Sequence, residues 1–133
     1  MINKRKIITS EISAGELLDK ISILEIKLYK IKNKNSHNQV NKEYKILNKV
    51  KHSNIKLTTK IKKLIKEIKK VNLNLWNIED EIRVHEKNKD FRLKFIKLAR
   101  SVYLNNDKRA KIKSQINKIS KSNINEVKQY IKY

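Results

Sequence analysis

Hydrophobic residues recur along this chain at alternating steps of four and three positions, the spacing of an apolar face on an α-helix. The longest stripe runs without a break from residue 57 to residue 85. At a rise of 1.5 Å per residue, it predicts a helix about 43 Å long. The stripe consists of Leu57, Ile61, Leu64, Ile68, Val71, Leu75, Ile78, Ile82 and His85.

A second stripe near the start of the chain predicts another helix. It follows Ser13-Ala14-Gly15-Glu16, which is typical of a capping box, where a Ser hydroxyl and a Glu carboxylate bind free backbone N–H groups at a helix start. We expect this helix to begin at Ser13, to end near Asn33 and to be followed by a loop over 33–38. Its apolar positions are Leu17, Ile21, Leu24, Leu28 and Ile31.

Weaker patterns predict three more helices. A short helix with Val40, Tyr44 and Leu47 on one side is expected to end near 52–54. Asp90 is the expected cap of a fourth helix over 91–102, and the polar run 105–107 is expected to end that helix and to cap a fifth. The apolar positions of these helices are Val40, Tyr44, Leu47, Phe91, Phe95, Leu98, Val102, Ile112, Ile116 and Ile119.

The chain has one glycine and no proline in 133 residues, which leaves few residues for the tight turns of a β-sheet. We therefore expect an all-α protein, an antiparallel helical bundle of about four to five helices with one long central helix. A single domain would span 1–133, with an extended segment over 1–12 and a loosely ordered tail over 122–133. The long apolar seam also suits pairing with a second copy, so a homodimer and a monomer are both open.

The formal net charge is +21, from 34 Lys and Arg against 13 Asp and Glu. Such an excess favours contact with phosphate groups, and Lys56, Lys60, Lys63 and Lys70 would form a strip along the long helix. Lys, Ile and Asn, whose codons are rich in A and T, fill 66 of the 133 positions. The base composition of the genome therefore explains part of the charge.

Several classes of protein are not indicated by the sequence. There is no cysteine, no apolar run of the roughly 18 residues that a membrane helix needs and no apolar stretch of signal-peptide length over 1–10. We expect a cytoplasmic protein that is not inserted into a membrane. No spacing indicates a catalytic triad, and one glycine cannot build a phosphate-binding loop. We expect no catalytic residue, no metal site and no cofactor.

Three groups of polar residues are candidates for a site that binds a ligand or a partner. The first lies on the first predicted helix. Glu16 and Asp19, three positions apart, share a helix face and could join in a ligand site. Glu16 and Lys20 could instead form an exposed ion pair.

The second group is Trp76, Glu79, Asp80 and Arg83 on the long helix. The Arg83 guanidinium could be held by the neighbouring carboxylates and still present its fork to a partner, or the group could be a plain salt-bridge ladder. Trp76 lies one step off the apolar stripe, where its ring would cover a packed helix or stack on a ligand.

The third group is Tyr103, Asp107, Arg109 and Lys113, around the expected turn between the last two helices. Asp107 is the expected N-cap of the fifth helix. Arg109 and Lys113 share one face of that helix and could receive an anionic group such as a phosphate. They could equally bind the acids of the long helix in an internal network.

Four stretches of the chain resemble an uncharacterised bacterial family described only as a domain of unknown function. They are ISAGELLDKISILEIK (12–27), LWNIEDEIR (75–83), FIKLARSVYLNNDKRAKIKSQIN (95–117) and the tail around Glu126. The resemblance covers nearly the whole chain and is weakest over 31–70. Members of the family sometimes occur beside genes for glycosyltransferases and surface-polysaccharide assembly, so the resemblance implies a link to such systems without implying an activity.

The sequence thus favours a small non-enzymatic helical interaction module whose polar groups bind a protein partner or an anionic ligand. One alternative is nonspecific nucleic-acid binding through the lysine-rich 31–75 face. Another is an enzyme acting on a phosphorylated or nucleotide-linked sugar, with Glu16, Asp19, Glu79 or Asp80 as acid, base or metal ligand.

Overall fold

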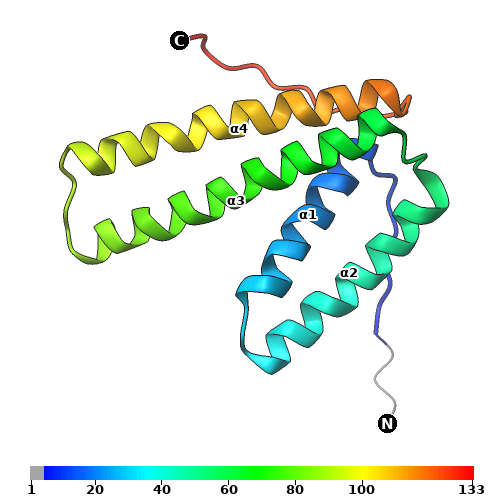
Figure 1. Ribbon diagram of the computed structural model, residues 1–133, viewed down its shortest axis with the longest axis horizontal. Coiled ribbons are helices and arrows are strands. Elements are labelled where there is room, and N and C mark those ends of the chain that lie inside the picture. Colours follow the sequence, from blue (N-terminus) through cyan, green and yellow to red (C-terminus); the bar gives the residue numbers. More distant parts are fainter. Residues whose placement is uncertain (1–4) are drawn as a thin grey trace.

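A computed structural model describes residues 5–133, and over these residues the protein is all-α, with four helices and no strand (Figure 1). The helices are α1 (Ala14–Lys30), α2 (Lys34–Asn54), α3 (Thr59–Lys87) and α4 (Leu93–Ile119). In the part of the chain that the structure describes, no helix is both long enough and apolar enough to cross a membrane.

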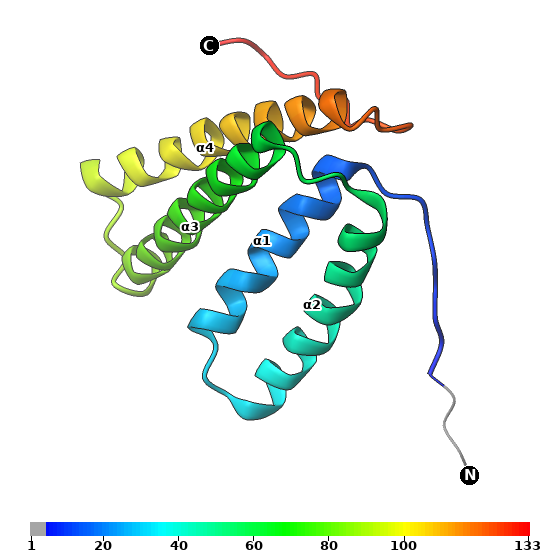
Figure 2. The same cartoon turned by 45° about the vertical axis from the view of Figure 1, so that its right-hand side comes forward.

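The helices form two hairpins, and α1 makes the contacts between them. α1 and α2 make one hairpin, and α3 and α4 make the other (Figure 1). Figure 2 shows α1 between α2 and the α3–α4 hairpin, and α1 packs against both α3 and α4. Polar side chains of α1 are therefore enclosed by two other helices.

α1 begins where the sequence predicts. The Ser13 hydroxyl accepts a hydrogen bond from the Glu16 backbone N–H (3.2 Å), as an N-cap should. The reciprocal half of the capping box was predicted wrongly, because the Glu16 carboxylate accepts from Lys113 instead (2.9 Å). Two side chains at the C-terminal end of α4 complete the cap. Asn117 Oδ1 accepts from the Gly15 N–H (2.6 Å), and Ser122 Oγ, just after the helix, accepts from the Ala14 N–H (2.8 Å).

Gly15 allows α1 to approach α4 this closely. A Cβ atom at this position would lie 2.6 Å from the backbone oxygen of Lys113 and 2.8 Å from Asn117 Oδ1. These distances are shorter than van der Waals contact, and the nearer neighbour is backbone that cannot turn away. The only glycine of the chain therefore lies at a point of close contact between the two hairpins.

The predicted end of the second helix near 52–54 is confirmed, because α2 ends at Asn54, but the predicted loop over 33–38 and the short length of that helix were wrong. The connection is only 31–33, and α2 has 21 residues. Asn33 caps α2 by accepting from the Ser36 N–H (3.0 Å), and the His37 ring bonds to the Leu28 carbonyl (3.1 Å). The polar residues of this stretch thus stabilise the start of α2, because an Asn side chain can bond to the backbone in a helix cap as well as in a loop.

α3 agrees closely with its predicted stripe. The stripe residues from Ile61 to Leu75 are buried, while Ile78, Ile82 and His85 are only half-buried. Buried residues of α1, α3 and α4 form one core cluster, which consists of Leu18, Ile61, Leu64, Ile68, Val71, Leu75, Ile112 and Ile116. The core therefore lies where three helices meet and thins out toward the α3–α4 turn.

The predicted break at 105–107 does not exist, and the fourth and fifth predicted helices are one helix of 27 residues. Asp107 is therefore not an N-cap. The Asn105 side chain bonds back to the Ser101 carbonyl (2.8 Å), which keeps it compatible with a helix interior. Asn and Asp each cost well under 1 kcal/mol in a helix, so packing against α3 overrides them. Nor is Asp90 the cap, since α4 begins after Arg92.

Candidate functional site

A cleft of about 460 Å³ lies where α1, α3 and α4 meet. α3 contributes most of its polar lining, and α4 adds one amide and one guanidinium. The apolar floor comes from Ile23, Ile26 and Leu75, and the polar and aromatic lining consists of Asn72, Trp76, Glu79, Asp80, Arg83, Asn106 and Arg109. We call this the α1–α3–α4 cleft. It unites the second predicted group with Arg109 of the third.

Arg109 enters the cleft from α4 and is held by two neutral amides. Its Nη1 donates to Asn72 Oδ1 (3.1 Å) and its Nη2 donates to Asn106 Oδ1 (2.7 Å). Within the described residues, no carboxylate lies within 4.0 Å of its guanidinium nitrogens. Arg109 is half-buried, and a partly desolvated cation without a counter-ion is unusual in a protein interior.

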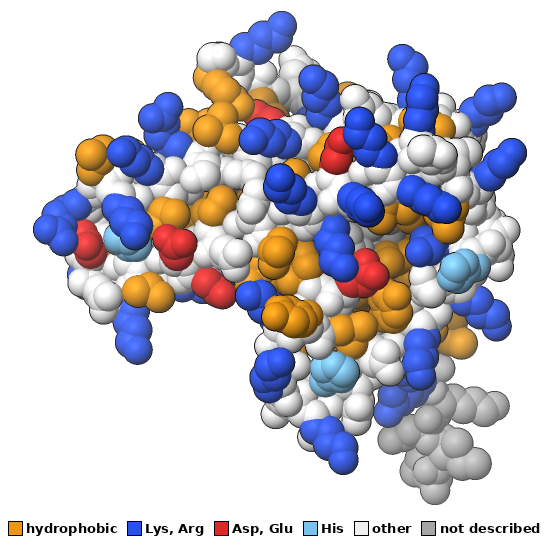
Figure 3. Space-filling model, in the orientation of Figure 1, with side chains coloured by type: hydrophobic (Ala, Val, Ile, Leu, Met, Phe, Trp, Pro, Cys, Tyr) orange, Lys and Arg blue, Asp and Glu red, His pale blue; other side chains and the backbone are white. Residues whose placement is uncertain are grey.

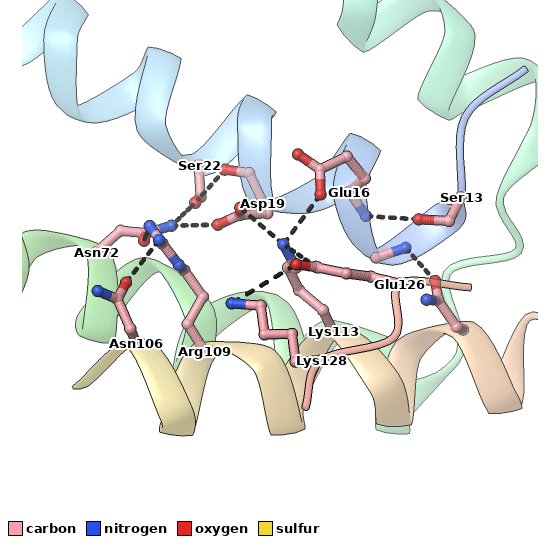
Figure 4. A network of polar contacts seen from close by, with 12 residues as sticks. Ser13, Glu16, Asp19, Ser22, Asn72, Asn106, Arg109, Lys113, Glu126 and Lys128 are labelled. Atoms are coloured by element: carbon pink, nitrogen blue, oxygen red, sulfur yellow. Dashed lines mark hydrogen bonds and ion pairs between the residues drawn. The ribbon is translucent and has the colours of Figure 1, made fainter. Parts of the chain in front are cut away.

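Asn72 fixes Arg109 through a buried network that reaches α1. Its amide nitrogen donates to Asp19 Oδ1 and to Ser22 Oγ, both at 2.7 Å, while its amide oxygen accepts from Arg109. The Ser22 hydroxyl in turn donates to the Asp19 carbonyl (2.7 Å). Both hydrogens and the oxygen of the Asn72 amide are thus used (Figure 4), as expected of a side chain that is 96% buried (4% exposed).

Lys113 is the centre of a second cluster, one helical turn further along α4. Its ammonium group contacts Glu16 Oε2 (2.9 Å), Glu126 Oε2 (2.8 Å) and Asp19 Oδ2 (3.8 Å). Burial lowers the pKa of Lys113, but hydrogen bonds to Glu126 and Glu16 and the charge of Asp19 outweigh it and raise the pKa above its ordinary value. The hydrogen bond from Lys113 likewise lowers the pKa of Glu126. Lys113 is therefore a charged structural tie between α1, α4 and the C-terminal tail (Figure 4).

The predicted site residues thus separate into two environments. Trp76, Glu79, Asp80, Arg83 and Arg109 line the cleft. Two other residues, Asp19 and Lys113, are buried beside it, with Glu16 on the Lys113 ammonium. The internal network expected for Arg109 and Lys113 does not involve the acids of the long helix, because Arg109 binds amides and Lys113 binds the acids of α1 and the tail.

Lys20, Tyr103 and Asp107 lie outside the cleft lining. Lys20 pairs with Glu43 of α2 (3.3 Å), so the ion pair expected between Glu16 and Lys20 is absent from the described residues. The Tyr103 ring packs edge-on against Tyr133, whose hydroxyl donates to Asp107. This hydrogen bond raises the pKa of Tyr133. Both residues therefore hold the end of the tail against α4.

The salt-bridge ladder considered for Arg83 is also not formed. Over residues 5–133, neither Glu79, Asp80 nor Arg83 takes part in an ion pair within 4.0 Å, and Glu86 pairs with Lys89 instead. Figure 3 shows acidic side chains over the C-terminal part of α3, at the left, on a face otherwise rich in Lys and Arg. The charges at the cleft rim are consequently available to a binding partner.

Sequence reasoning missed Asn72, Ser22 and Asn117, which hold the site together. Asn72 lies four positions after Ile68 and three before Leu75, on the flank of the apolar stripe. A small polar residue at such a position is a signal for a buried polar contact, because that flank faces a third packed helix. No group of three or more His, Asp or Glu side chains suited to a metal ion occurs among the described residues.

Comparison with known proteins identifies one family. Residues 8–132 match a family described as a family of unknown function, DUF6165. Neither the curated proteins nor the solved structures contain a match to the chain.

Proposed function

The chain belongs to the family of unknown function DUF6165, and we propose that it is a small non-enzymatic interaction module. Its binding surface is the α1–α3–α4 cleft. What the cleft receives is an anionic group, carried either by a protein partner or by a small ligand.

The observation that carries this proposal is the charge of Arg109. Two amides orient the guanidinium and satisfy two of its five donors, but amides do not neutralise its charge. Arg83 lines the same cleft and has no ion pair among the described residues. A carboxylate or phosphate between the two guanidinium groups would form charge-assisted, bidentate hydrogen bonds.

The remaining lining gives the expected partner a second feature. Trp76 is half-buried beside the cleft, so one part of its ring is free to cover an apolar or planar group. Glu79 and Asp80 offer acceptors close by. We expect the bound group to combine a negative charge with hydrogen-bond donors, as a peptide segment or a phosphorylated sugar does.

An enzyme acting on a phosphorylated or nucleotide-linked sugar is the alternative. Of the four acids considered for it, Asp19 and Glu16 are engaged with Lys113. Glu79 and Asp80 are the only acid–base side chains of the cleft lining, so this alternative rests on them. The link to polysaccharide or glycosyltransferase systems rests on the resemblance alone.

The finer expectations from the sequence also stay proposals. We treat the four helices as an antiparallel bundle with α3 as the long central helix, working in the cytoplasm. A second copy of the chain is one of the protein partners to test, by sedimentation of the purified protein.

The test is a thermal-shift screen of the purified protein at raised salt, which screens exposed charges. The panel contains inorganic phosphate, nucleotides, nucleotide sugars and acidic peptides. We expect a stabilising shift from at least one anion, lost in Arg83→Gln and kept in Arg100→Gln, which removes an exposed Arg of α4 outside the cleft. Equal responses of the two variants would exclude the cleft as the site. Turnover of a nucleotide sugar, abolished in Asp80→Asn, would favour the enzyme.

A further inference from the structure

A second concave surface follows the opposite side of the α3–α4 hairpin. Two hollows of about 420 and 380 Å³ lie between α3 and α4. Both are lined by Glu67 and Gln115, so they adjoin and form one groove along the hairpin. We call this surface the α3–α4 groove.

Helix geometry sets the groove apart from the cleft. Lys70 of the groove and Asn72 of the cleft are two positions apart on α3, which is about 200° around a helix with 3.6 residues per turn. On α4, Lys111 of the groove and Arg109 of the cleft are related in the same way. A ligand can therefore occupy either surface without touching the other.

Lysines line both rims of the groove. α3 and α4 contribute three each, and Glu67 is the only acidic residue of the lining. Within the described part of the chain, none of these lysines has a carboxylate within 4.0 Å. The six are Lys60, Lys63, Lys70, Lys108, Lys111 and Lys118.

We infer that the α3–α4 groove binds a flexible chain of phosphate groups, such as the backbone of single-stranded nucleic acid or inorganic polyphosphate. The rims run from Lys60 to Lys70 and from Lys108 to Lys118, each ten steps along its helix or about 15 Å at the helical rise. A groove of this length can contact several consecutive phosphates of one chain.

The shape and lining of the groove limit what it can recognise. Packed helices lie about 8–10 Å apart, so a groove between two of them is too narrow to enclose a duplex. The lining has no aromatic residue on which a base could stack. Binding therefore depends on the backbone phosphates, is blind to sequence and weakens with salt.

The arrangement adds to what the lysine-rich sequence indicates. A base-composition bias places lysines on every exposed surface, including α2. The structure adds that lysines from two separate segments, 31–75 and 108–118, line facing rims of one groove, and that the second segment lies outside the stretch that the sequence marks as basic.

The experiment compares two triple variants of equal charge. Lys63→Gln/Lys108→Gln/Lys111→Gln removes charge from both rims, and Lys42→Gln/Lys45→Gln/Lys49→Gln removes the same charge from exposed positions of α2. Fluorescence anisotropy measures the binding of a labelled oligouridylate at several salt concentrations. Circular dichroism checks that both variants are folded.

We expect the groove variant to bind at least about tenfold more weakly at low salt. The slope of log K against log salt concentration should be smaller in magnitude by about 0.7 for each lost phosphate contact. The α2 variant should bind nearly as the parent does. Unlabelled polyphosphate and oligouridylate then compete at equal phosphate concentration, and the stronger competitor identifies the source of the phosphate chain. Equal losses in the two triple variants, tighter binding of a duplex, or no binding at low salt would each overturn the inference. None of these results depends on the cleft.

Discussion

At the scale of single residues, Asn72 decides whether the buried polar groups between α1, α3 and α4 are satisfied. Its amide joins Asp19 to Arg109, and the removal of one partner leaves a buried group to bear its desolvation cost. We predict that Asn72→Ala lowers the free energy of unfolding by about 1–3 kcal/mol. Urea denaturation measures this loss.

The control for this prediction lies two positions away on the same helix. Asn74 is exposed, so Asn74→Ala makes the same change of helix propensity without touching the network. It should change the stability by no more than about 0.5 kcal/mol. If both variants were equally stable, the Asn72 contacts would contribute no net stability.

The residues of the cleft differ in how far the sequence reveals them. Trp76, Glu79, Asp80 and Arg83 follow one another on one helix, so their spacing alone places them together. The meeting of Arg109 with them depends on how two helices pack, which no local pattern contains. The burial of Asp19 and Lys113 could not be predicted from local sequence either. Charged residues are rarely buried unless they are paired, and the partners of these two lie far away in the sequence.

At the scale of the helices, capping separates the elements that the sequence predicts from those that it does not. Ser13 is an N-cap and Asp107 is in a helix interior, although both residue types are good caps. We predict that Ser13→Ala costs about 1 kcal/mol of stability, whereas Asp107→Ala changes it by less than about 0.5 kcal/mol. Thermal unfolding followed by circular dichroism compares the two.

The Asp107→Ala variant also tests whether α4 is a single helix. An Asp107→Ala variant that lost about 1 kcal/mol or more, together with helical signal, would indicate a helix start at 107. It would then support two helices in place of α4.

The helices show why apolar stripes were a better guide than polar runs. The stripe of α3 reports burial directly, and its predicted and observed bounds differ by two residues at each end. The polar runs 33–38 and 105–107 have no Gly or Pro, the residues that interrupt a helix most strongly. Their Asn residues bond equally well in a cap, a loop or a helix, so only the tertiary packing decides between these states.

At the scale of the whole molecule, the C-terminal tail returns to the start of α1. The Glu126 carboxylate reaches Lys113 between α1 and α4, and Asn123 donates to Glu11 (2.8 Å). Tyr133 contacts α4 further along through Tyr103 and Asp107. Lys113 thus joins α1, α4 and the C-terminal tail, and the Asn123 contact brings the segment before α1 to the same end of the molecule.

This tie makes stability depend on pH. The hydrogen bond from Lys113 lowers the pKa of Glu126 below its ordinary value of 4.5, so the pair stabilises the fold above that pH and loses its effect as the pH falls through the lowered pKa. The pKa of Lys113 is raised above its ordinary value of 10.5, so the pair loses its stabilising effect only as the pH rises through that raised pKa. The contribution is therefore complete between about pH 4.5 and 10.5.

Glu126→Gln tests this dependence, because the neutral amide resembles the protonated acid. The Glu126 side chain is 42% exposed, so solvent screening limits the expected loss at neutral pH to a few tenths of a kcal/mol. That loss should disappear on acidification, when the parent protein also has a neutral side chain at 126. Urea denaturation from neutral to acid pH measures the difference, with Glu81→Gln as the control for one exposed negative charge that has no ion pair among the described residues. A difference that persists in acid would mean that the side chain at 126 acts through packing, and the charge of Lys113 would then be balanced by α1 alone.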